Sequence, residues 1–139
     1  MKTKYSNEVT IVKENYRGWP NTYHLSNGVV EARVVTDVGP RIIDVRRNGG
    51  ENLLQEREGI GSSGEPTYQF RGGWRLWVAP ERRETTYALD NSPCQVEVID
   101  TSTVRVTGSP QPEAGIQKSV EVSLLAGEPR LHLDRKSVV

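Results

Sequence analysis

One stretch of the chain concentrates residue types that can bind a small polar ligand. Residues 72–83 contain Trp74 and Trp77, with Arg75 and Glu81 close by. Aromatic rings offer apolar faces for stacking, and charged groups offer hydrogen bonds that fix the orientation of a ligand. A second interpretation stays open, in which the tryptophans fill the space between two sheets and the charged side chains face water.

Alternation of side chains along a strand divides this stretch between two faces. If the backbone is extended, Arg75 and Trp77 share one side, and Trp74 lies on the other. We therefore expect Arg75 and Trp77 to meet one ligand, and Trp74 to face the core. A β-bulge at Gly72-Gly73 would redirect these side chains.

Glu81 is the carboxylate of this stretch that is best placed to accept hydrogen bonds from a ligand. Its alternative role is a surface ion pair with Arg82 or Arg83, which would contribute about 0–1 kcal/mol.

The composition argues against several classes of function. Lysine and arginine together number 18, as do aspartate and glutamate, so no net charge attracts nucleic acid or an anionic membrane. The start of the chain lacks the apolar core of a signal peptide, and no run reaches the roughly 18 apolar residues of a membrane span. We expect a cytoplasmic protein that binds neither nucleic acid nor membrane.

Cofactors and metal ions have no visible sequence support. Cys94 is the single cysteine, so it has no partner for a disulfide or for a CxxC metal site. The sequence also lacks a His/Cys cluster and a phosphate-binding glycine motif that opens a helix. We expect no cofactor and no metal.

Short alternating segments rich in β-branched residues, separated by turn residues, predict an all-β fold of antiparallel strands. We find no segment with convincing helical periodicity. Asn27-Gly28 predicts a tight hairpin because both residues accept positive φ. Strands are expected at residues 8–13, 22–25, 29–36, 41–47, 51–54, 85–89, 95–100, 103–107, 116–124 and 130–133, with a break at 17–21 and a loop at 59–64.

The strand at 116–124 has one apolar face, formed by Ile116, Val120, Val122 and Leu124. Lys118 interrupts that face, and we expect it near the edge of the face.

The last six residues, 134–139, look like one reading frame of a sequencing adapter. We interpret them as a non-native tail, and residues 1–133 as the N-terminal part of one domain. On this interpretation the intact protein is longer, and the present chain has an unpaired sheet edge.

Four segments, in order, resemble the galactose-mutarotase-like family, which includes the aldose 1-epimerases. They are LSNG (25–28), DVGPRI (37–42), ENLL (51–54) and GGWRLWVAPE (72–81), and the last looks most like an uncharacterised branch of that group. The resemblance covers only the N-terminal half of the family's domain. It implies an antiparallel β-sandwich of the supersandwich type, incomplete here, that binds a small saccharide.

The resemblance also implies a role for Arg41. In the epimerases, an arginine in a Gly-Gly-Arg-Ile-like turn contacts the sugar, and Arg41 has that position, although Pro40 replaces the second glycine. The forked donors of a guanidinium suit vicinal hydroxyls. An ion pair of Arg41 with Asp44 or a nearby glutamate is the alternative. The residues expected to bind the saccharide are Arg41, Arg75, Trp77 and Glu81.

Catalysis by this chain alone is not expected. The epimerases use a glutamate base and a histidine acid, and both belong to later stretches than those matched here. His24 and His132 lie in no recognisable catalytic motif. The longer parent could be an aldose 1-epimerase-like enzyme, with its catalytic residues unassigned.

Two non-enzymatic interpretations compete with that reading. One is a non-catalytic carbohydrate-binding domain. The other is a β-sandwich interaction or structural module whose tryptophan-rich face packs on another subunit. The sequence gives no indication of the oligomeric state.

Overall fold

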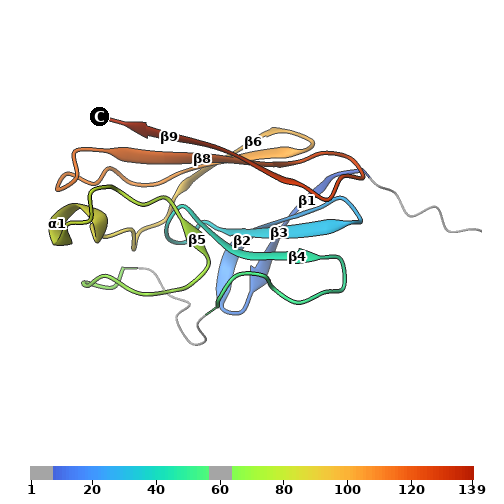
Figure 1. The fold of residues 1–139 in the computed structure, drawn as a ribbon, viewed down its shortest axis with the longest axis horizontal. Helices are drawn as coiled ribbons and strands as arrows, with labels where there is room; N and C mark the ends of the chain where they lie inside the picture. Colours follow the sequence, from blue (N-terminus) through green and yellow to red (C-terminus); the bar gives the residue numbers. More distant parts are fainter. Residues whose placement is uncertain (1–7, 57–63) are drawn as a thin grey trace, which may run out of the picture.

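The computed structural model describes residues 8–56 and 64–139, which form two antiparallel β-sheets and one short helix (Figure 1). The predicted all-β class is therefore confirmed, and the arrangement is consistent with a β-sandwich. The first sheet has the order β1-β2-β3-β4-β5 and the second β6-β7-β8-β9. The elements are β1 (Thr10–Tyr16), β2 (Trp19–Ser26), β3 (Val30–Val35), β4 (Arg41–Arg47), β5 (Trp74–Arg75), α1 (Arg83–Thr86), β6 (Gln95–Asp100), β7 (Thr103–Thr107), β8 (Gln117–Leu124) and β9 (Leu131–Val138).

A tight turn at Arg17-Gly18 joins β1 to β2. The φ angles of these residues are 47° and 89°, the pair of positive angles typical of the two-residue hairpin turn that matches strand twist. Tyr16 therefore pairs directly with Trp19. The predicted break at residues 17–21 was too long, because Trp19 and Pro20 already belong to β2.

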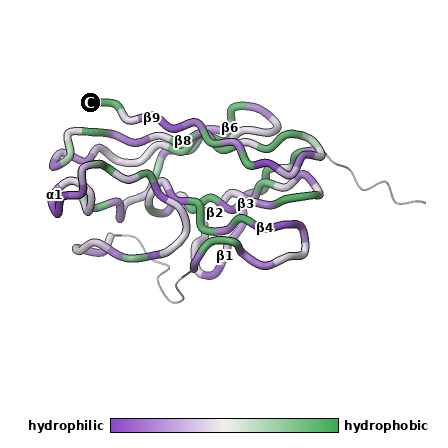
Figure 2. Tube along the Cα trace, in the orientation of Figure 1, coloured by the Kyte–Doolittle hydropathy of each residue, from purple (hydrophilic) through white to green (hydrophobic). Residues whose placement is uncertain are grey.

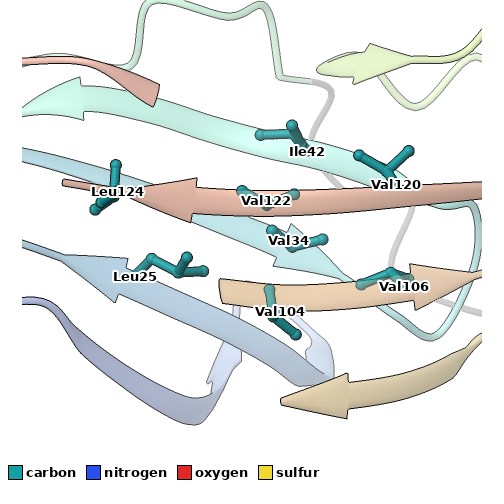
Figure 3. Close-up of a cluster of buried hydrophobic side chains, with 8 residues drawn as sticks. All are labelled: Leu25, Val34, Ile42, Val104, Val106, Val120, Val122 and Leu124. Atoms are coloured by element: carbon teal, nitrogen blue, oxygen red, sulfur yellow. The ribbon is translucent and has the colours of Figure 1, made fainter. Parts of the chain in front are cut away.

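The main core lies between the two sheets and combines side chains from both (Figure 3). The alternation along β8 is confirmed, since every second residue from Lys118 to Leu124 is buried. Each such apolar side chain stabilises the fold by about 1.5–3 kcal/mol when fully buried. The buried cluster is Leu25, Val34 and Ile42 from the first sheet, with Val104, Val106, Val120, Val122 and Leu124 from the second.

Asn27 links the turn after β2 to the turn between β8 and β9. Its side chain is fully buried, and its Oδ1 accepts hydrogen bonds from the backbone N–H groups of Val29 and Val30 at 3.0 and 2.9 Å. Its Nδ2 donates to the carbonyl oxygens of Leu125 and Glu128, both at 2.7 Å. The positive φ of this turn is at Gly28 alone, at 81°, so the prediction of positive φ at both turn residues was wrong. The contribution of Asn27 is therefore the four hydrogen bonds of its side-chain amide.

The outer side of β4 carries a buried carboxylate with two arginine partners. Asp44 is fully buried and forms ion pairs with Arg33 at 2.5 Å and Arg46 at 2.7 Å. Both carboxylate oxygens of Asp44 are thus paired with arginines of the first sheet. The alternative role of Arg41 as a partner of Asp44 was wrong.

The predicted strand at residues 51–54 is irregular backbone in the structure. The side chain of Asn52 replaces strand pairing along β4, because its Oδ1 accepts from the N–H of Val45 and its Nδ2 donates to the carbonyl of Ile43. The loop predicted at 59–64 lies outside the described residues except for Gly64.

The predicted strand at 85–89 was also wrong, because residues 83–86 form α1. The Thr86 hydroxyl accepts a hydrogen bond from the N–H of Arg82 and donates to the carbonyl of Val78. This side chain folds the segment back on itself, so two consecutive threonines do not extend as β-propensity predicts.

The last strand is longer than predicted. β9 pairs with β8 from Leu131 to Val138, and its side chains are exposed from Asp134 onward. Figure 2 shows α1 and the middle of β9 in the purple of hydrophilic residues. Within residues 8–56 and 64–139, no helix has the length and hydropathy required to cross a lipid bilayer.

Candidate functional site

The site is built around β5, which consists of only two residues. β5 pairs with the start of β4, with Arg75 opposite Arg41 and Trp74 opposite Ile42. Trp74 packs against the main core, which confirms the prediction that it faces inward. Arg75 and Arg41 are directly opposed in the ladder, so their side chains leave the sheet on the same face.

Two glycines precede β5 at a point where the backbone passes very close to the backbone of Gln55 and Ile42. Gly72 and Gly73 have φ of 80° and 73°, a region that residues with a Cβ rarely adopt. A Cβ at Gly72 would collide with the carbonyl oxygen of Gln55, and one at Gly73 with that of Ile42. The two glycines therefore allow the chain to pass close to β4 and position Arg75.

A cavity of about 540 Å³ opens beside this strand pair. Its volume is in the usual range for small-molecule sites, about 300–1,000 Å³. Phe70 and Trp77, which are 60% and 53% exposed, provide apolar surface at the cavity. The lining residues are Arg41, Gln55, Tyr68, Phe70, Arg71, Gly72, Gly73, Arg75 and Trp77.

Aromatic rings surround the guanidinium of Arg75. Its Cζ lies 3.9 Å from the ring centroid of Trp77, 4.9 Å from that of Tyr68 and 6.0 Å from that of Tyr87. Tyr87 in turn packs edge-on against both other rings, at 5.2 Å from Tyr68 and 5.8 Å from Trp77. Cation–π attraction to these rings stabilises the buried positive charge.

Asp90 is the acidic partner of Arg41, and it acts on Arg75 only as a nearby charge. Arg41 is 3% exposed, and it donates to the carbonyl oxygen of Gly72 at 2.5 Å and to Asp90 at 3.4 Å. Arg75 is 6% exposed and donates to the carbonyl of Thr86 at 3.1 Å. Burial lowers the pKa of the Arg75 guanidinium, and the nearby Arg41 charge acts in the same direction, partly offset by Tyr68 and Asp90. An arginine nevertheless keeps its proton at neutral pH.

Arg71 is also buried, but its charge is balanced locally. It forms an ion pair with Glu65 at 2.8 Å and donates to the side-chain oxygen of Asn91 at 2.7 Å. Its guanidinium lies over the ring of Trp19. This arginine fixes the segment that precedes β5.

Lys118 approaches the same cluster from the second sheet. It is 6% exposed and is the first buried residue of β8, at one end of the apolar face and outside the main core cluster. Its pKa is lowered to about 8, mainly by burial and then by the charges of Arg75 and Arg41, whereas Asp90 acts in the opposite direction. Lys118, which interrupts the apolar pattern of β8, therefore adds a positive charge from the second sheet near Arg75 and Arg41.

The structure brings together three of the four predicted site residues. Arg41, Arg75 and Trp77 line the cavity, and Arg75 lies directly over the ring of Trp77 as period-two alternation predicted. Glu81 is exposed and is not a lining residue. Its carboxylate accepts a hydrogen bond from the hydroxyl of Tyr87, so the suggested ion pair with Arg82 or Arg83 is replaced by this contact.

Sequence reasoning missed several residues of the site. Tyr68 and Phe70 carry a usable signal, because aromatic residues two positions apart share a face of an extended segment. Asp90 offered no such signal, since it meets Arg41 across 49 positions of sequence.

No acid/base pair of the expected kind is present at the cavity in the part of the chain that the structure describes. The lining contains neither histidine nor carboxylate. His24 instead lies within hydrogen-bonding distance of Glu31, at 2.9 Å, on the first sheet. Among the described residues, no group of three His, Cys, Asp or Glu side chains could hold a metal ion.

No protein-family model matches the chain, and neither a curated protein nor a solved structure is significantly similar to it. The resemblance to galactose-mutarotase-like proteins therefore stays a prediction from the segments quoted above.

Proposed function

We propose that this chain binds a small saccharide in the cavity beside β5, as a galactose-mutarotase-like domain. The observation that supports this most is the combination of surfaces in one cavity. Exposed rings of Phe70 and Trp77 offer faces for the apolar side of a pyranose, and Arg41 and Arg75 offer donors for its oxygen atoms. The four segments quoted from the sequence support this proposal only as a resemblance.

Isothermal titration calorimetry and tryptophan emission, with a panel of monosaccharides and disaccharides, test the proposal. Saccharide binding should change the emission and release or absorb heat. Trp77→Ala should lower the affinity about tenfold or more, because a central aromatic contact typically contributes over 1 kcal/mol. Val98→Ala is a matched control, since Val98 is 54% exposed on β6 and does not line the cavity. No heat and no emission change across the panel would refute saccharide binding.

We propose binding without catalysis for this chain. A mutarotase needs a base for the anomeric hydroxyl and an acid for the ring oxygen, and the described lining supplies neither. An aldose 1-epimerase-like activity would belong to a longer parent that contributes both groups. Polarimetry of freshly dissolved glucose and galactose should therefore give the spontaneous rate with this chain present. A rate increase that depends on chain concentration would show that the chain is itself catalytic.

The alternative, an interaction module, draws on the exposure of Phe70 and Trp77. A partner subunit would cover these rings and protect Trp77 from acrylamide quenching. Light scattering and acrylamide quenching test an interface formed by a second copy of the chain. A monomeric protein whose tryptophan emission is quenched efficiently by acrylamide would argue against that interface.

A further inference from the structure

We infer that the saccharide in this cavity carries a carboxylate group, as a uronic acid does, and that Arg75 and Arg41 bind that group. The inference rests on the proposed function, because it names the chemical class of the saccharide expected in the same cavity. It goes beyond that function in predicting a charge preference that neutral-sugar binding does not require.

The first argument is the balance of charge at the β4–β5 pair. Arg41 and Arg75 are direct cross-strand partners, and both are more than nine-tenths buried. Like charges placed opposite each other destabilise a sheet. In the described part of the chain, Asp90 is the one carboxylate within ion-pair distance of either arginine, at 3.4 Å from Arg41. The pair therefore has one more positive charge than negative.

The second argument is the inventory of hydrogen-bond donors. Nε and Nη1 of Arg75 are buried and have no hydrogen-bond partner among the described residues, and the same holds for Nε of Arg41. A guanidinium cannot remove this cost by losing a proton. These nitrogens have almost no accessible surface, so a ligand carboxylate reaches them only when the guanidinium groups turn toward the cavity. The charge-assisted hydrogen bonds formed there are stronger than bonds to neutral hydroxyls.

The third argument is the position of Lys118. Its ammonium comes from β8 and reinforces the positive field at Arg75 and Arg41, with Asp90 as the opposing charge. Burying this amine lowers the stability of the fold, so its presence calls for a compensating interaction. A ligand carboxylate next to Arg75 would provide one by favouring the charged form of Lys118.

The cavity favours a sugar acid over a bare inorganic anion. At about 540 Å³ it is larger than a single ion requires, and three of its nine lining residues, Tyr68, Phe70 and Trp77, are aromatic. The ring of a uronate can contact Phe70 and Trp77 while its carboxylate reaches the arginines.

Matched sugar pairs test this inference. Galacturonate is compared with galactose, and glucuronate with glucose, by calorimetry at pH 7 and low ionic strength, with sodium sulfate as the inorganic probe. We expect the uronates to bind about tenfold more tightly than their neutral partners, as charge-assisted bonds replace neutral ones. Uronate affinity should fall with added sodium chloride, whereas the affinity of a neutral sugar should not. Arg75→Gln should abolish the preference for uronates.

The outcomes separate the two proposals. Equal affinities for the members of each pair would overturn the inference and leave saccharide binding in place. Failure of every sugar to bind would overturn both, and binding of sulfate without any uronate would overturn the acidic-saccharide assignment. If Arg75→Gln does not fold, as judged by circular dichroism, Lys118→Met supplies the second variant, and an undiminished uronate preference in it would contradict the role of the positive cluster.

Discussion

Replacing Lys118 by methionine should make the protein more stable at neutral pH. The side chain is 6% exposed, and burial, followed by the charges of Arg75 and Arg41, lowers its pKa from 10.5 to about 8. That difference corresponds to about 3 kcal/mol, at about 1.4 kcal/mol for each factor of ten in proton affinity. Methionine has a similar length and an apolar body, so it fills the same space without a charge to desolvate.

The gain should depend on pH in a defined direction. Because the folded-state pKa of Lys118 is lower than the unfolded-state value, the unfolded chain binds more protons between about pH 8 and pH 10.5. The wild-type protein therefore gains stability as pH rises through this window, and the cost of the buried charge is fully present below about pH 8. The advantage of Lys118→Met should be largest at pH 7 and small at pH 10.

Urea unfolding of both proteins at several pH values from 6 to 10, followed by circular dichroism, measures this difference. Lys13→Met is the control, because Lys13 is exposed on β1 and its replacement should change stability little at any pH. A variant that is less stable than wild type at pH 7, or a gain that is the same at pH 7 and pH 10, would refute the reasoning.

Three further changes probe the backbone, the link between the sheets and the thiol. Gly73→Ala should lower stability by about 2 kcal/mol or more and reduce ligand binding, because a Cβ there collides with the Ile42 carbonyl at a φ of 73°; urea unfolding and calorimetry measure both effects. Asn27→Ala should cost about 1–3 kcal/mol in urea unfolding, since it deletes a fully buried amide with four hydrogen bonds. Cys94 should react slowly with a disulfide reagent at pH 8 in the folded protein and rapidly in urea, because burial raises the pKa of its thiol to about 12.

Each of these predictions has a control within the same chain. Gly49 has nearly the same φ, 74°, but nothing within 4 Å of a Cβ, so Gly49→Ala isolates backbone strain from collision. Asn27→Asp keeps a side-chain acceptor but loses the donors to the second sheet. Equal losses of stability in Gly73→Ala and Gly49→Ala would contradict the collision argument. A negligible loss of stability in Asn27→Ala would contradict the role of its amide. Equal thiol reactivity in the folded and the unfolded protein would contradict the burial of Cys94.

Side-chain alternation and turn residues predicted the strands well where a strand pairs with the next strand along the chain. The bounds of β4, β6 and β7 agree with the expected residues, because alternation and flanking turn residues define each hairpin. Predictions failed where a single side chain replaced backbone pairing, as Asn52 does beside β4 and Thr86 does at α1. Such hydrogen bonds depend on the tertiary position of one polar atom, which residue propensity does not encode.

The sequence predicted only those relationships in the candidate site that join residues close together in the chain. Period-two alternation placed Arg75 with Trp77, which are two residues apart. The opposition of Arg41 and Arg75 depends on a pairing between segments more than thirty positions apart, and the acidic partner Asp90 joins from another loop. The interrupting lysine at 118 was noticed in the sequence, but its burial follows from the packing of the second sheet on the first.

Each sheet is assembled from one continuous half of the described chain, and this has a kinetic consequence. β1 to β4 and β6 to β9 can each form as successive hairpins with short loops to close, which are fast events. Contacts between the sheets, such as Asn27 with Leu125, join residues about a hundred positions apart. We therefore expect docking of two partly formed sheets to limit the folding rate. Truncation of the Asn27 amide should then accelerate unfolding while leaving the folding rate nearly unchanged.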